Sequence, residues 1–508
     1  MVSDTDVRAT RPRHPRETPL GVVAGWLGVA APDEQPTVTG ISLSTARIVP
    51  GDLYAALPGA RAHGADFAAD AVAAGAVAVL TDPDGAERVA AAGVPVLVVD
   101  RPRSVLGSLA ARLHGEPARA MRMIAVTGTQ GKTTTTRLAE RALSEVGVRV
   151  AVVGTVGTRV AGEEVRTALT TPEAPDLHGL FALMVERDVE VCAMEVSSHA
   201  LVLGRVDGVV FDVAVFTNLG RDHLDFHADV EEYYAAKAAL FTPERARRGL
   251  VNVDDAHGRR LATEASIPVR TFSAAGEPAD WRAAEVEAGP EGSEFTVLGP
   301  DGLRLRTRVP IAGDFNVANA LAAVAAAAEA GLDPARTADG LARAGGVPGR
   351  LERVETGREF TVVVDYAHKP DAVEAALRTL RPLTGGRLVV VLGAGGDRDT
   401  GKRPVMGEIA ARLADVVLVT DDNPRSEEPA AIRAAILAGA TEGPAEVHDV
   451  AGRREAIRRA LADAAAGDIV LIAGKGHETG QEVAGVLHPF DDREVVREEL
   501  ARLEGGDA

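Results

Sequence analysis

The chain has 508 residues, of which 46% are hydrophobic and 25% charged, with 53 glycines and 28 prolines. This composition excludes disordered, fibrous and disulfide-stapled proteins, and the length predicts about two to four globular domains. A net charge of −19 and an aromatic content of only 3% argue against a nucleic-acid partner.

The single cysteine, Cys192, excludes an intramolecular disulfide and a cysteine zinc site, so we expect a cytoplasmic protein. It stands in an apolar stretch, which predicts a small core residue. Residues 1–16 are polar and no apolar segment follows them, so we expect a loose tail and not a signal peptide. Apolar runs such as 71–80 are too short to span a bilayer, so we expect no membrane partner. We also expect a monomer.

The first block of the chain, residues 1–117, contains two short β-type runs, at 77–80 and 94–99, between alanine-rich helical stretches. It shows no cluster of catalytic residue types. We therefore predict a small α/β recognition domain.

The second block, residues 118–346, begins with an apolar strand at 121–126, a Gly/Thr loop and a helix that ends near Gly147. Four further runs are typical of buried strands: 149–153, 189–195, 212–217 and 250–253. Their alternation with helices predicts a doubly wound, mostly parallel sheet. Period-two patterning over 281–309, with a turn at 299–302, predicts an antiparallel hairpin region, and an alanine-rich helix follows at 316–330.

A glycine–proline break at 345–349 opens the third block, residues 347–508. The α/β alternation repeats there, with strands predicted at 360–365, 388–392, 416–420 and 469–473 and helices that include 371–380 and 403–413. Each strand ends in a polar or glycine-rich cluster. Ligands bind at the carboxyl ends of strands in open α/β sheets, so these clusters are candidate binding residues.

A phosphate loop is predicted where the strand at 121–126 meets its helix, in the segment Thr127-Gly128-Thr129-Gln130-Gly131-Lys132-Thr133-Thr134. Backbone amides of the loop would hold phosphate oxygens, Lys132 would neutralise the terminal phosphates, and the Thr133 hydroxyl would ligate Mg²⁺. The first glycine of the usual pattern is Val126 here. The alternative is a helix start rich in threonine caps, which the strand–loop–helix context disfavours.

Two polar clusters follow neighbouring predicted strands. Glu195 ends one strand and precedes Val196-Ser197-Ser198-His199, and the segment 218–227 follows the strand that ends at Thr217. Taken alone, such side chains are more often caps or satisfied polar residues. Beside a phosphate loop they favour a Mg²⁺ site.

These segments, together with 234–237, 313–319, Arg350 and 365–370, stand in the order and spacing of the ATP-dependent Mur ligases. The chain resembles this family over nearly its whole length after Gly40. The resemblance implies three domains: an N-terminal α/β uridine-nucleotide domain, a central doubly wound P-loop ATPase domain, and a C-terminal Rossmann-like domain that binds an amino acid. It implies an ATP-dependent amide ligase of peptidoglycan precursor synthesis.

Within that family, the segments 395–399, 422–425 and 474–478 are similar to those of members that add meso-diaminopimelate to UDP-N-acetylmuramoyl-L-Ala-D-Glu. The far end of diaminopimelate carries an ammonium and a carboxylate, and a guanidinium can clamp that carboxylate through two hydrogen bonds. The resemblance gives that role to Arg425 and Arg398, and the ammonium to Gly474 and Glu478. The implied residues are Arg398, Asp422, Asn423, Pro424, Arg425, Gly474 and Glu478.

The resemblance also implies that Lys237 reacts with CO₂ to form a carbamate, which needs a neutral amine and yields an anion that can ligate Mg²⁺ with His223. The implied catalytic residues are Lys132, Glu195, Lys237 and His223, and the metal ligands are Thr133, Glu195, His223 and Lys237. ATP contacts outside the loop are implied at Asn319, Arg350, Asp365 and His368. For the base that deprotonates the attacking amine, His199 and His368 are the candidates.

The donor-binding segment departs from the family pattern, because the usual Asp-Ser-Arg is Ser44-Thr45-Ala46. Thr45 keeps a hydroxyl that can hydrogen-bond the nucleotide, and Leu203 replaces a polar residue frequent in relatives. The implied contacts of the UDP-linked muramoyl dipeptide are Leu43, Thr45, Ala60, Arg61, Ala62, Thr170, Thr171, Ser197 and Arg205.

Three alternatives stay open. A sister ligase that adds lysine or D-Ala-D-Ala, or a folylpolyglutamate-type ligase, shares the phosphate loop and differs in the third domain. A non-catalytic nucleotide-binding descendant is disfavoured because Lys132, Glu195 and Lys237 are all present. A P-loop kinase or motor ATPase would show a strand ending in a Walker-B aspartate and no amino-acid pocket.

Overall fold

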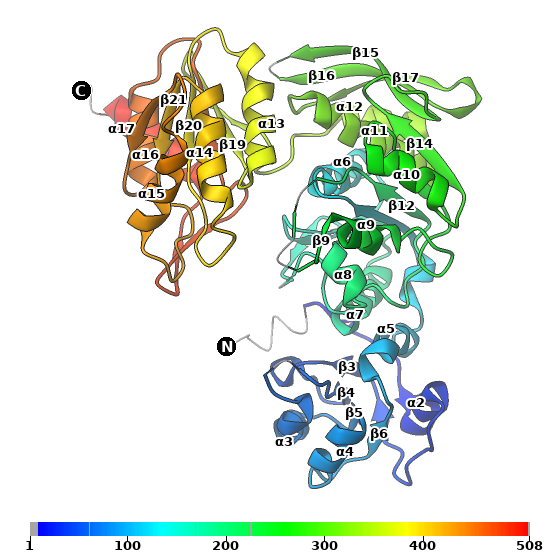
Figure 1. Cartoon of the computed structure of the whole chain (residues 1–508). Coiled ribbons are helices and arrows are strands. Elements are labelled where there is room, and N and C mark those ends of the chain that lie inside the picture. Colours follow the sequence, from blue (N-terminus) through cyan, green and yellow to red (C-terminus); the bar gives the residue numbers. More distant parts are fainter. Residues whose placement is uncertain are drawn as a thin grey trace. The chain divides into compact units, whose positions relative to one another are not determined.

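The computed structural model describes residues 9–59, 61–167, 169–220, 222–223, 226–289 and 291–505. It contains a four-stranded, an 11-stranded and a six-stranded sheet, each accompanied by helices (Figure 1). The expected three-domain α/β architecture is confirmed. The boundaries at residues 117 and 346 stay predictions. The chain forms two compact units. The first contains the residues up to Ala284 together with Val297–Leu305 and Ala318–Arg343, and the second contains the remaining residues.

The N-terminal sheet is parallel, in the order β3 (Gly40–Ser42), β4 (Asp52–Ala55), β5 (Ala78–Thr81) and β6 (Val96–Val98). Strands β5 and β6 match the predicted runs, whereas β3 and β4 are additional. Successive side chains point to opposite faces, so Leu53 packs in one cluster and Tyr54 in another. The helices that supply these clusters are α2 (Leu20–Leu27), α5 (Pro102–Leu113), α3 (Ala68–Ala73) and α4 (Pro83–Val89).

The segment before this sheet makes ion-pair and hydrogen-bond contacts with other parts of the chain. The prediction of a loose tail is therefore wrong for residues 9–16. Arg11 pairs with the buried Asp52 at 2.6 Å. The backbone amides of Arg13 and His14 donate to the carboxylate of Glu186 at 2.7 and 2.8 Å. Strand β1 (Thr18–Pro19) then pairs with β2 (Thr37–Val38). Residues 1–8 lie outside the described residues.

The Arg11–Asp52 pair predicts a measurable loss of stability. Burial raises the pKa of Asp52, while the Arg11 guanidinium acts in the opposite direction. Replacing Arg11 by methionine leaves a buried carboxylate without its charged partner, so we expect the free energy of unfolding to fall by about 3 kcal/mol. Without Arg11 the pKa of Asp52 rises further, so protonation at lower pH shrinks the deficit. Thermal unfolding between about pH 8 and about pH 5 measures both effects.

The exposed neighbour Arg13 provides the matched control, because Arg13→Met removes a similar side chain without uncovering a buried carboxylate. A melting temperature that falls equally in both variants, or a deficit that grows as the pH falls, would contradict this account of the pair.

The central sheet places the phosphate-loop strand between two parallel neighbours, in the order β10-β9-β8-β11-β7-β12-β13-β14-β15-β16-β17. The strands from β8 to β15 are parallel. Their bounds are β7 (Arg122–Thr127), β8 (Val150–Val153), β9 (Thr158–Val160), β10 (Glu163–Val165), β11 (Val191–Glu195), β12 (Val213–Phe216), β13 (Gly249–Asn252), β14 (Val269–Ser273), β15 (Trp281–Gly289), β16 (Gly292–Leu298) and β17 (Arg304–Val309). The doubly wound sheet is therefore confirmed, and β9, β10 and β14 are additional strands.

Helices cover both faces of the parallel part of this sheet. Met123, Cys192 and Met194 pack against α7 in one core, and α6 contacts β7, β8 and β11. The helices are α6 (Lys132–Glu145), α7 (Ala174–Glu186), α8 (Ser198–Val202), α9 (Val230–Ala238), α10 (Ala256–Glu264), α11 (Asp314–Glu329) and α12 (Pro334–Arg343). Cys192 is fully buried, as predicted, and burial raises the pKa of its thiol to about 12.

The C-terminal sheet has the order β18-β19-β23-β20-β21-β22. Its strands are β18 (Glu352–Val354), β19 (Thr361–Asp365), β20 (Leu388–Leu392), β21 (Val416–Val419), β22 (Glu446–Asp449) and β23 (Ile469–Ala473), followed by the hairpin β24 (Gly480–Val483) and β25 (Val486–Pro489). All but β18 run parallel.

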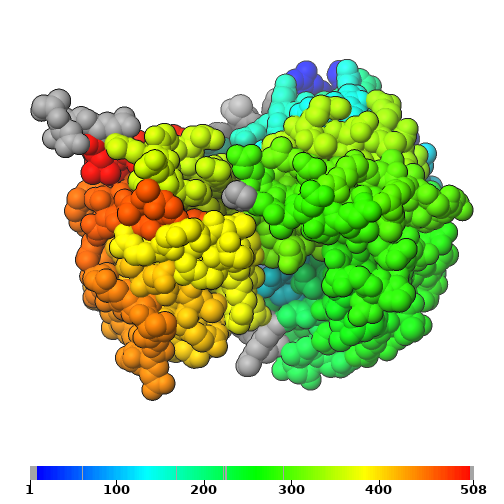
Figure 2. Space-filling model, turned by 90° about the horizontal axis from the view of Figure 1, so that it is seen from above, coloured from blue at the N-terminus to red at the C-terminus, as the bar shows by residue number. Residues whose placement is uncertain are grey.

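Helices α13 to α15 pack in sequence beside the C-terminal sheet, while α16 and α17 share a core with its alternate residues. Their bounds are α13 (Pro370–Leu380), α14 (Lys402–Leu413), α15 (Pro429–Gly439), α16 (Arg453–Ala462) and α17 (Asp492–Gly505). Figure 2 shows the surface of this part of the chain in yellow to red. In the described ranges, no helix has the length and hydrophobicity needed to cross a membrane.

Candidate active site

The phosphate loop joins the end of β7 to the start of α6, at the edge of the sheet where its neighbours β11 and β12 also end. Val126 lies in register with Glu195 of β11, and Thr127 with Phe216 of β12. Gly128 has a φ of +148°, and a Cβ atom there would lie 1.9 Å from the Thr217 hydroxyl. Only glycine fits, because the loop passes so close to the end of β12.

Side chains and backbone after β12 hold the loop in shape. The carbonyl of Asn218 accepts from the amide of Thr129, and its side-chain oxygen accepts from the amide of Gln130, both at 2.9 Å. The Thr217 hydroxyl donates to the Gln130 carbonyl at 2.6 Å. Asn319, the predicted ATP contact on α11, lies against the loop, since a Cβ atom on Gly131 would approach its side-chain oxygen to 2.4 Å.

Two lysines converge on one carbonyl of the loop. The Lys132 ammonium donates to the Gly128 carbonyl at 2.9 Å, and the Lys237 ammonium donates to the same oxygen at 2.8 Å. Lys237 is only 1% exposed and lies over the ring of Tyr233. The structure therefore brings together these two predicted catalytic residues, which are far apart in sequence.

Glu195 is buried at the end of β11 and is held by threonines. Its carboxylate accepts from the amide and the hydroxyl of Thr155 at 2.8 and 3.1 Å. Thr171 donates to the Glu195 carbonyl at 2.9 Å, and the Thr170 hydroxyl contacts that of Thr155 at 3.2 Å. Arg205 donates to the Thr171 carbonyl. Of the residues predicted for the dipeptide, Thr171 thus bonds Glu195 directly, while Thr170 and Arg205 are linked to it through Thr155 and Thr171.

Aromatic rings gather where β12 leads into α9. His223 has a φ of +53°, and its ring lies 4.8 Å from that of His199 and 6.0 Å from that of Tyr233. His199 stacks on Phe226 at 4.0 Å. Because Lys237 also lies over Tyr233, the predicted ligands His223 and Lys237 share one aromatic neighbour. Three members of the predicted cluster, Arg221, Leu224 and Asp225, lie outside the described residues.

The remaining predicted ATP contacts belong to the second unit and surround Tyr366. Arg350 lies over the Tyr366 ring, with 4.7 Å between the guanidinium carbon and the ring centroid, and the His368 ring is 4.5 Å away. The Asp365 carboxylate accepts from the amide of Leu351, and burial raises its pKa. Burial, reinforced by two nearby lysines, lowers the pKa of His368 to about 3. Such a weak base is unsuited to accept the amine proton near neutral pH, which argues against His368 in that role.

The residues predicted for diaminopimelate follow the ends of three neighbouring strands, β20, β21 and β23. Asn423 donates to the Glu478 carboxylate at 2.8 Å. Asp422 faces Gly474, where a Cβ atom would lie 2.2 Å from its carboxylate. Arg425 donates to the Gly396 carbonyl at 2.6 Å, beside the exposed Arg398. Pro424 is buried in the same turn. The predicted residues other than Arg398 therefore gather at this edge of the sheet, whereas no contact joins the exposed Arg398 side chain to them within the described ranges.

Three family models match in the order of the three sheets. The model described as Mur ligase family, catalytic domain, matches residues 37–114, the Mur ligase middle domain matches 126–327, and the Mur ligase, glutamate ligase domain matches 349–476. The chain belongs to the Mur ligase family.

Similar Mur ligases match almost end to end. The UDP-N-acetylmuramoyl-L-alanyl-D-glutamate–2,6-diaminopimelate ligase of Streptomyces avermitilis is 57% identical, covering 97% of this chain and 99% of its own. Its namesake in Streptomyces coelicolor is 58% identical with the same coverage. A solved structure of a ligase of that name superposes with a TM-score of 0.69 at 34% identity, covering 96% of this chain and 100% of its own.

The four residues predicted to hold Mg²⁺ in this Mur ligase fit the ion only in part while Lys237 is unmodified. The Thr133 hydroxyl and the Glu195 carboxylate are oxygen donors, which Mg²⁺ prefers. The Lys237 ammonium cannot bind a cation, whereas a carbamate on the same nitrogen would supply oxygen. Among the residues that the structure describes, no group of three or more His, Cys, Asp or Glu side chains could hold a metal ion. The fit therefore depends on the carbamate.

The predicted donor-nucleotide residues lie near the first sheet of the Mur ligase. Thr45 begins a short 3-10 helix, Thr45–Arg47, and Leu43 packs against the core of the sheet. Arg61 and Ala62 are exposed, and Ala60 lies outside the described residues. Ser197, by contrast, follows β11 of the central sheet, where it caps α8 by accepting from the amide of Ala200 at 3.1 Å.

Several contacts of the Mur ligase site were not predicted. Thr155 holds Glu195, Tyr233 underlies Lys237, and Tyr366 joins the ATP residues of the second unit. The fully buried Lys475 pairs with Glu478 at 3.1 Å. Lys475 and Tyr366 had a visible signal, their places inside the segments 474–478 and 365–370, and Tyr233 stands one helical turn before Lys237 on α9. The contact of Thr155 with Glu195 joins segments 40 residues apart, which no local pattern reveals.

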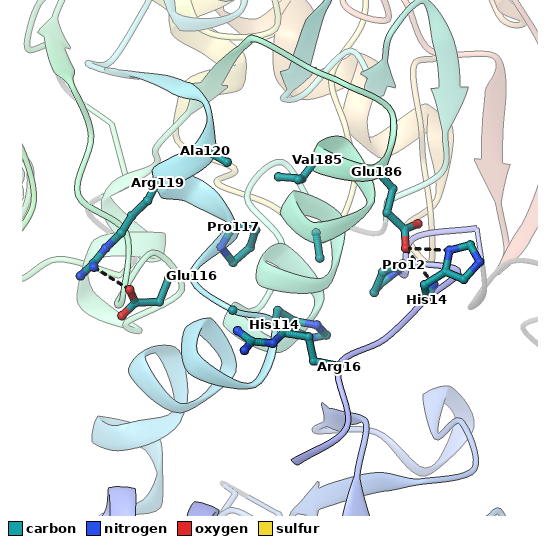
Figure 3. A pocket seen from close by; sticks show the side chains of 12 residues that line it. Pro12, His14, Arg16, His114, Glu116, Pro117, Arg119, Ala120, Val185 and Glu186 are labelled. Carbon is teal, nitrogen blue, oxygen red and sulfur yellow. Dashed lines mark hydrogen bonds and ion pairs between the residues drawn. The ribbon is translucent and has the colours of Figure 1, made fainter.

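A pocket of about 420 Å³ lies elsewhere in the first unit, between the N-terminal segment, residues 114–120 after α5, and α7 (Figure 3). None of the predicted site residues lines it. Two ion pairs lie at its walls: Arg119 with Glu116 at 2.7 Å within one segment, and His14 of the N-terminal segment with Glu186 of α7 at 3.5 Å.

Proposed function

We propose that this Mur ligase is the ATP-dependent enzyme that joins meso-diaminopimelate to the D-Glu of UDP-N-acetylmuramoyl-L-Ala-D-Glu, in the cytoplasm. The cluster formed by Asp422, Asn423, Arg425 and Glu478 carries the proposal. It offers a guanidinium and carboxylates side by side, as the carboxylate and ammonium at the far end of diaminopimelate require. The end-to-end similarity to ligases of that name supports the same substrate.

In the first step, the γ-carboxylate of D-Glu attacks the γ-phosphorus of ATP, which gives an acyl phosphate and ADP. Loop amides and the Lys132 ammonium stabilise the charge that develops on the transferring phosphoryl group. Mg²⁺, when bound, neutralises phosphate charge, and Thr133, Glu195, His223 and carbamylated Lys237 are the residues that would hold it. The amine of diaminopimelate then attacks the acyl carbon, and phosphate leaves as the amide forms.

The carbamate at Lys237 is part of this proposal, and the surroundings of the side chain support it. Burial and the like charge of Lys132 on the same carbonyl both favour the neutral amine that reacts with CO₂. His199 is the remaining candidate for the base that deprotonates the incoming amine.

Arg425→Ala is expected to raise the KM for meso-diaminopimelate about 100-fold with little change in the KM for ATP. The Gly396 carbonyl and the Glu482 carboxylate hold the guanidinium at Nη1 and Nε. Nη2 has no hydrogen-bond partner within the described ranges and is free for a substrate carboxylate. Steady-state kinetics with each substrate varied in turn measures both constants.

Arg412→Ala, on the exposed side of α14, is the matched control and should leave both constants unchanged. Arg425→Lys should not rescue binding, because a single ammonium cannot contact the Gly396 carbonyl, the Glu482 carboxylate and a substrate carboxylate in the way that the three nitrogens of a guanidinium can. An equal rise in both KM values would contradict the assignment.

The function itself is tested by incubating the purified chain with ATP, the UDP-linked dipeptide and meso-diaminopimelate. We expect ADP release to require both co-substrates and the product to be the UDP-linked tripeptide. ADP release without any amino-acid acceptor would indicate a simple ATPase. Turnover only with D-Ala-D-Ala or with glutamate would indicate a sister ligase.

A further inference from the structure

We propose that Lys475 is a positioning residue that orients Glu478 toward the far ammonium of the amino-acid substrate, an inference that rests on the function proposed above. Lys475 follows Gly474 at the end of β23, and its side chain is fully buried. Its ammonium donates to the Asn423 side-chain oxygen at 3.0 Å and to Oε2 of Glu478 at 3.1 Å. It thus joins two strand ends, those of β21 and β23.

The three side chains form a closed triangle of hydrogen bonds. Nδ2 of Asn423 donates to the same Oε2 of Glu478 at 2.8 Å, so Glu478 receives two donors on one oxygen. The orientation of the Asn423 amide is determined independently, because its oxygen also accepts from the backbone amide of Glu482 at 2.9 Å. Each member of the triangle therefore restricts the other two.

The second oxygen of the Glu478 carboxylate, Oε1, accepts no hydrogen bond from any residue in the described part of the chain. The Glu478 side chain is 32% exposed, while its partner Lys475 is buried. Lys475 and Asn423 therefore bind the inner oxygen and leave the outer one for a ligand. A fixed acceptor of this kind suits an ammonium group, the group that distinguishes diaminopimelate from its mono-amino analogue.

Charge balance supports the same role. Asp422 and Glu478 place two carboxylates at this end of the site, and Lys475 offsets one of them. Arg453 and Arg425 also lie here, but each is paired with a further carboxylate, Asp492 at 2.7 Å and Glu482 at 3.4 Å. One negative charge therefore remains to match one substrate ammonium.

The choice of lysine is unusual for this chain. It has 55 basic residues, and nearly all are arginine. Lysine stands only at Lys132, Lys237, Lys369, Lys402 and Lys475. A buried corner with two acceptors on one nitrogen suits the compact ammonium, whereas a planar guanidinium would need more room. We therefore expect that Lys475→Arg does not substitute for the native residue.

The test compares two substrates, meso-diaminopimelate and L-2-aminopimelate, which keeps the far carboxylate but lacks the far ammonium. In Lys475→Met we expect the ratio of their kcat/KM values to fall about tenfold, through a higher KM for meso-diaminopimelate. Turnover of L-2-aminopimelate should stay close to wild type, which also shows that the variant is folded. In a Glu478→Gln background, Lys475→Met should change the ratio little further, since both act through one carboxylate.

The outcomes separate this inference from the proposed function. If the wild type uses meso-diaminopimelate and Lys475→Met leaves the ratio unchanged, or lowers kcat/KM equally for both substrates, the positioning role is overturned and the function stands. Full additivity of the two substitutions also overturns it. If the wild type does not use meso-diaminopimelate, both the function and this inference fail.

Discussion

Lys132→Met is expected to lower kcat about 100- to 1000-fold while the protein stays folded. Lys132 is held at the phosphate loop by the carbonyls of Gly128 and Thr129, at 2.9 and 3.1 Å. Its charge is thus fixed where the terminal phosphates of ATP would lie. Methionine keeps most of the volume but removes the charge that stabilises the transferring phosphoryl group. The rate of ADP formation under saturating substrates measures the loss.

Arg141→Met, on the same helix α6, serves as the matched control because it removes a positive charge farther from the loop. We expect its kcat to stay within about twofold of the wild type. A Lys132→Met enzyme that kept a comparable rate would show that the loop is a structural helix start and not the phosphate site.

Lys237→Ala is expected to lose about 100-fold or more of its activity and to regain part of it when acetate or formate is added. The buried side chain reaches the Gly128 carbonyl, so its removal opens a space beside the loop. If the working form is a carbamate, a small carboxylate can enter that space and supply the missing oxygens. Initial rates measured against carboxylate concentration report the rescue.

Lys237→Arg is the informative companion, because a guanidinium keeps the positive charge, fills the space and cannot form the carbamate. It should be inactive and should not respond to acetate. An alanine variant that is fully active, with or without carboxylate, would remove the carbamate from the mechanism. Labelled bicarbonate should also be incorporated in the wild type and not in either variant.

The strands that carry the site are predictable from the sequence because each is a continuous apolar run followed by glycine or polar residues. Leu388–Leu392 and Ile469–Ala473 have the predicted bounds. The missed strands lack that signal. Strands β24 and β25 are short and largely solvent-accessible, and β3 and β4 of the first sheet have no long apolar run.

The contacts within the site are harder to predict, because they join segments distant in sequence. Lys475 and Asn423 are separated by 52 residues, and Lys237 and Gly128 by 109. Arg11 reaches Asp52 across 41 residues, which is why the N-terminal segment was expected to be loose. A motif predicts which residues gather at a strand end, but only the packed fold determines which atoms meet.

The most direct test of the central claim is a competition between meso-diaminopimelate and L-lysine, present in equal amounts with ATP and the UDP-linked dipeptide. Mass spectrometry of the products resolves the two tripeptides in one reaction. Arg425 would bind the far carboxylate, which diaminopimelate has and lysine lacks. We therefore predict that the diaminopimelate tripeptide exceeds the lysine tripeptide about 100-fold or more. Equal amounts of the two products, or an excess of the lysine tripeptide, would contradict the account.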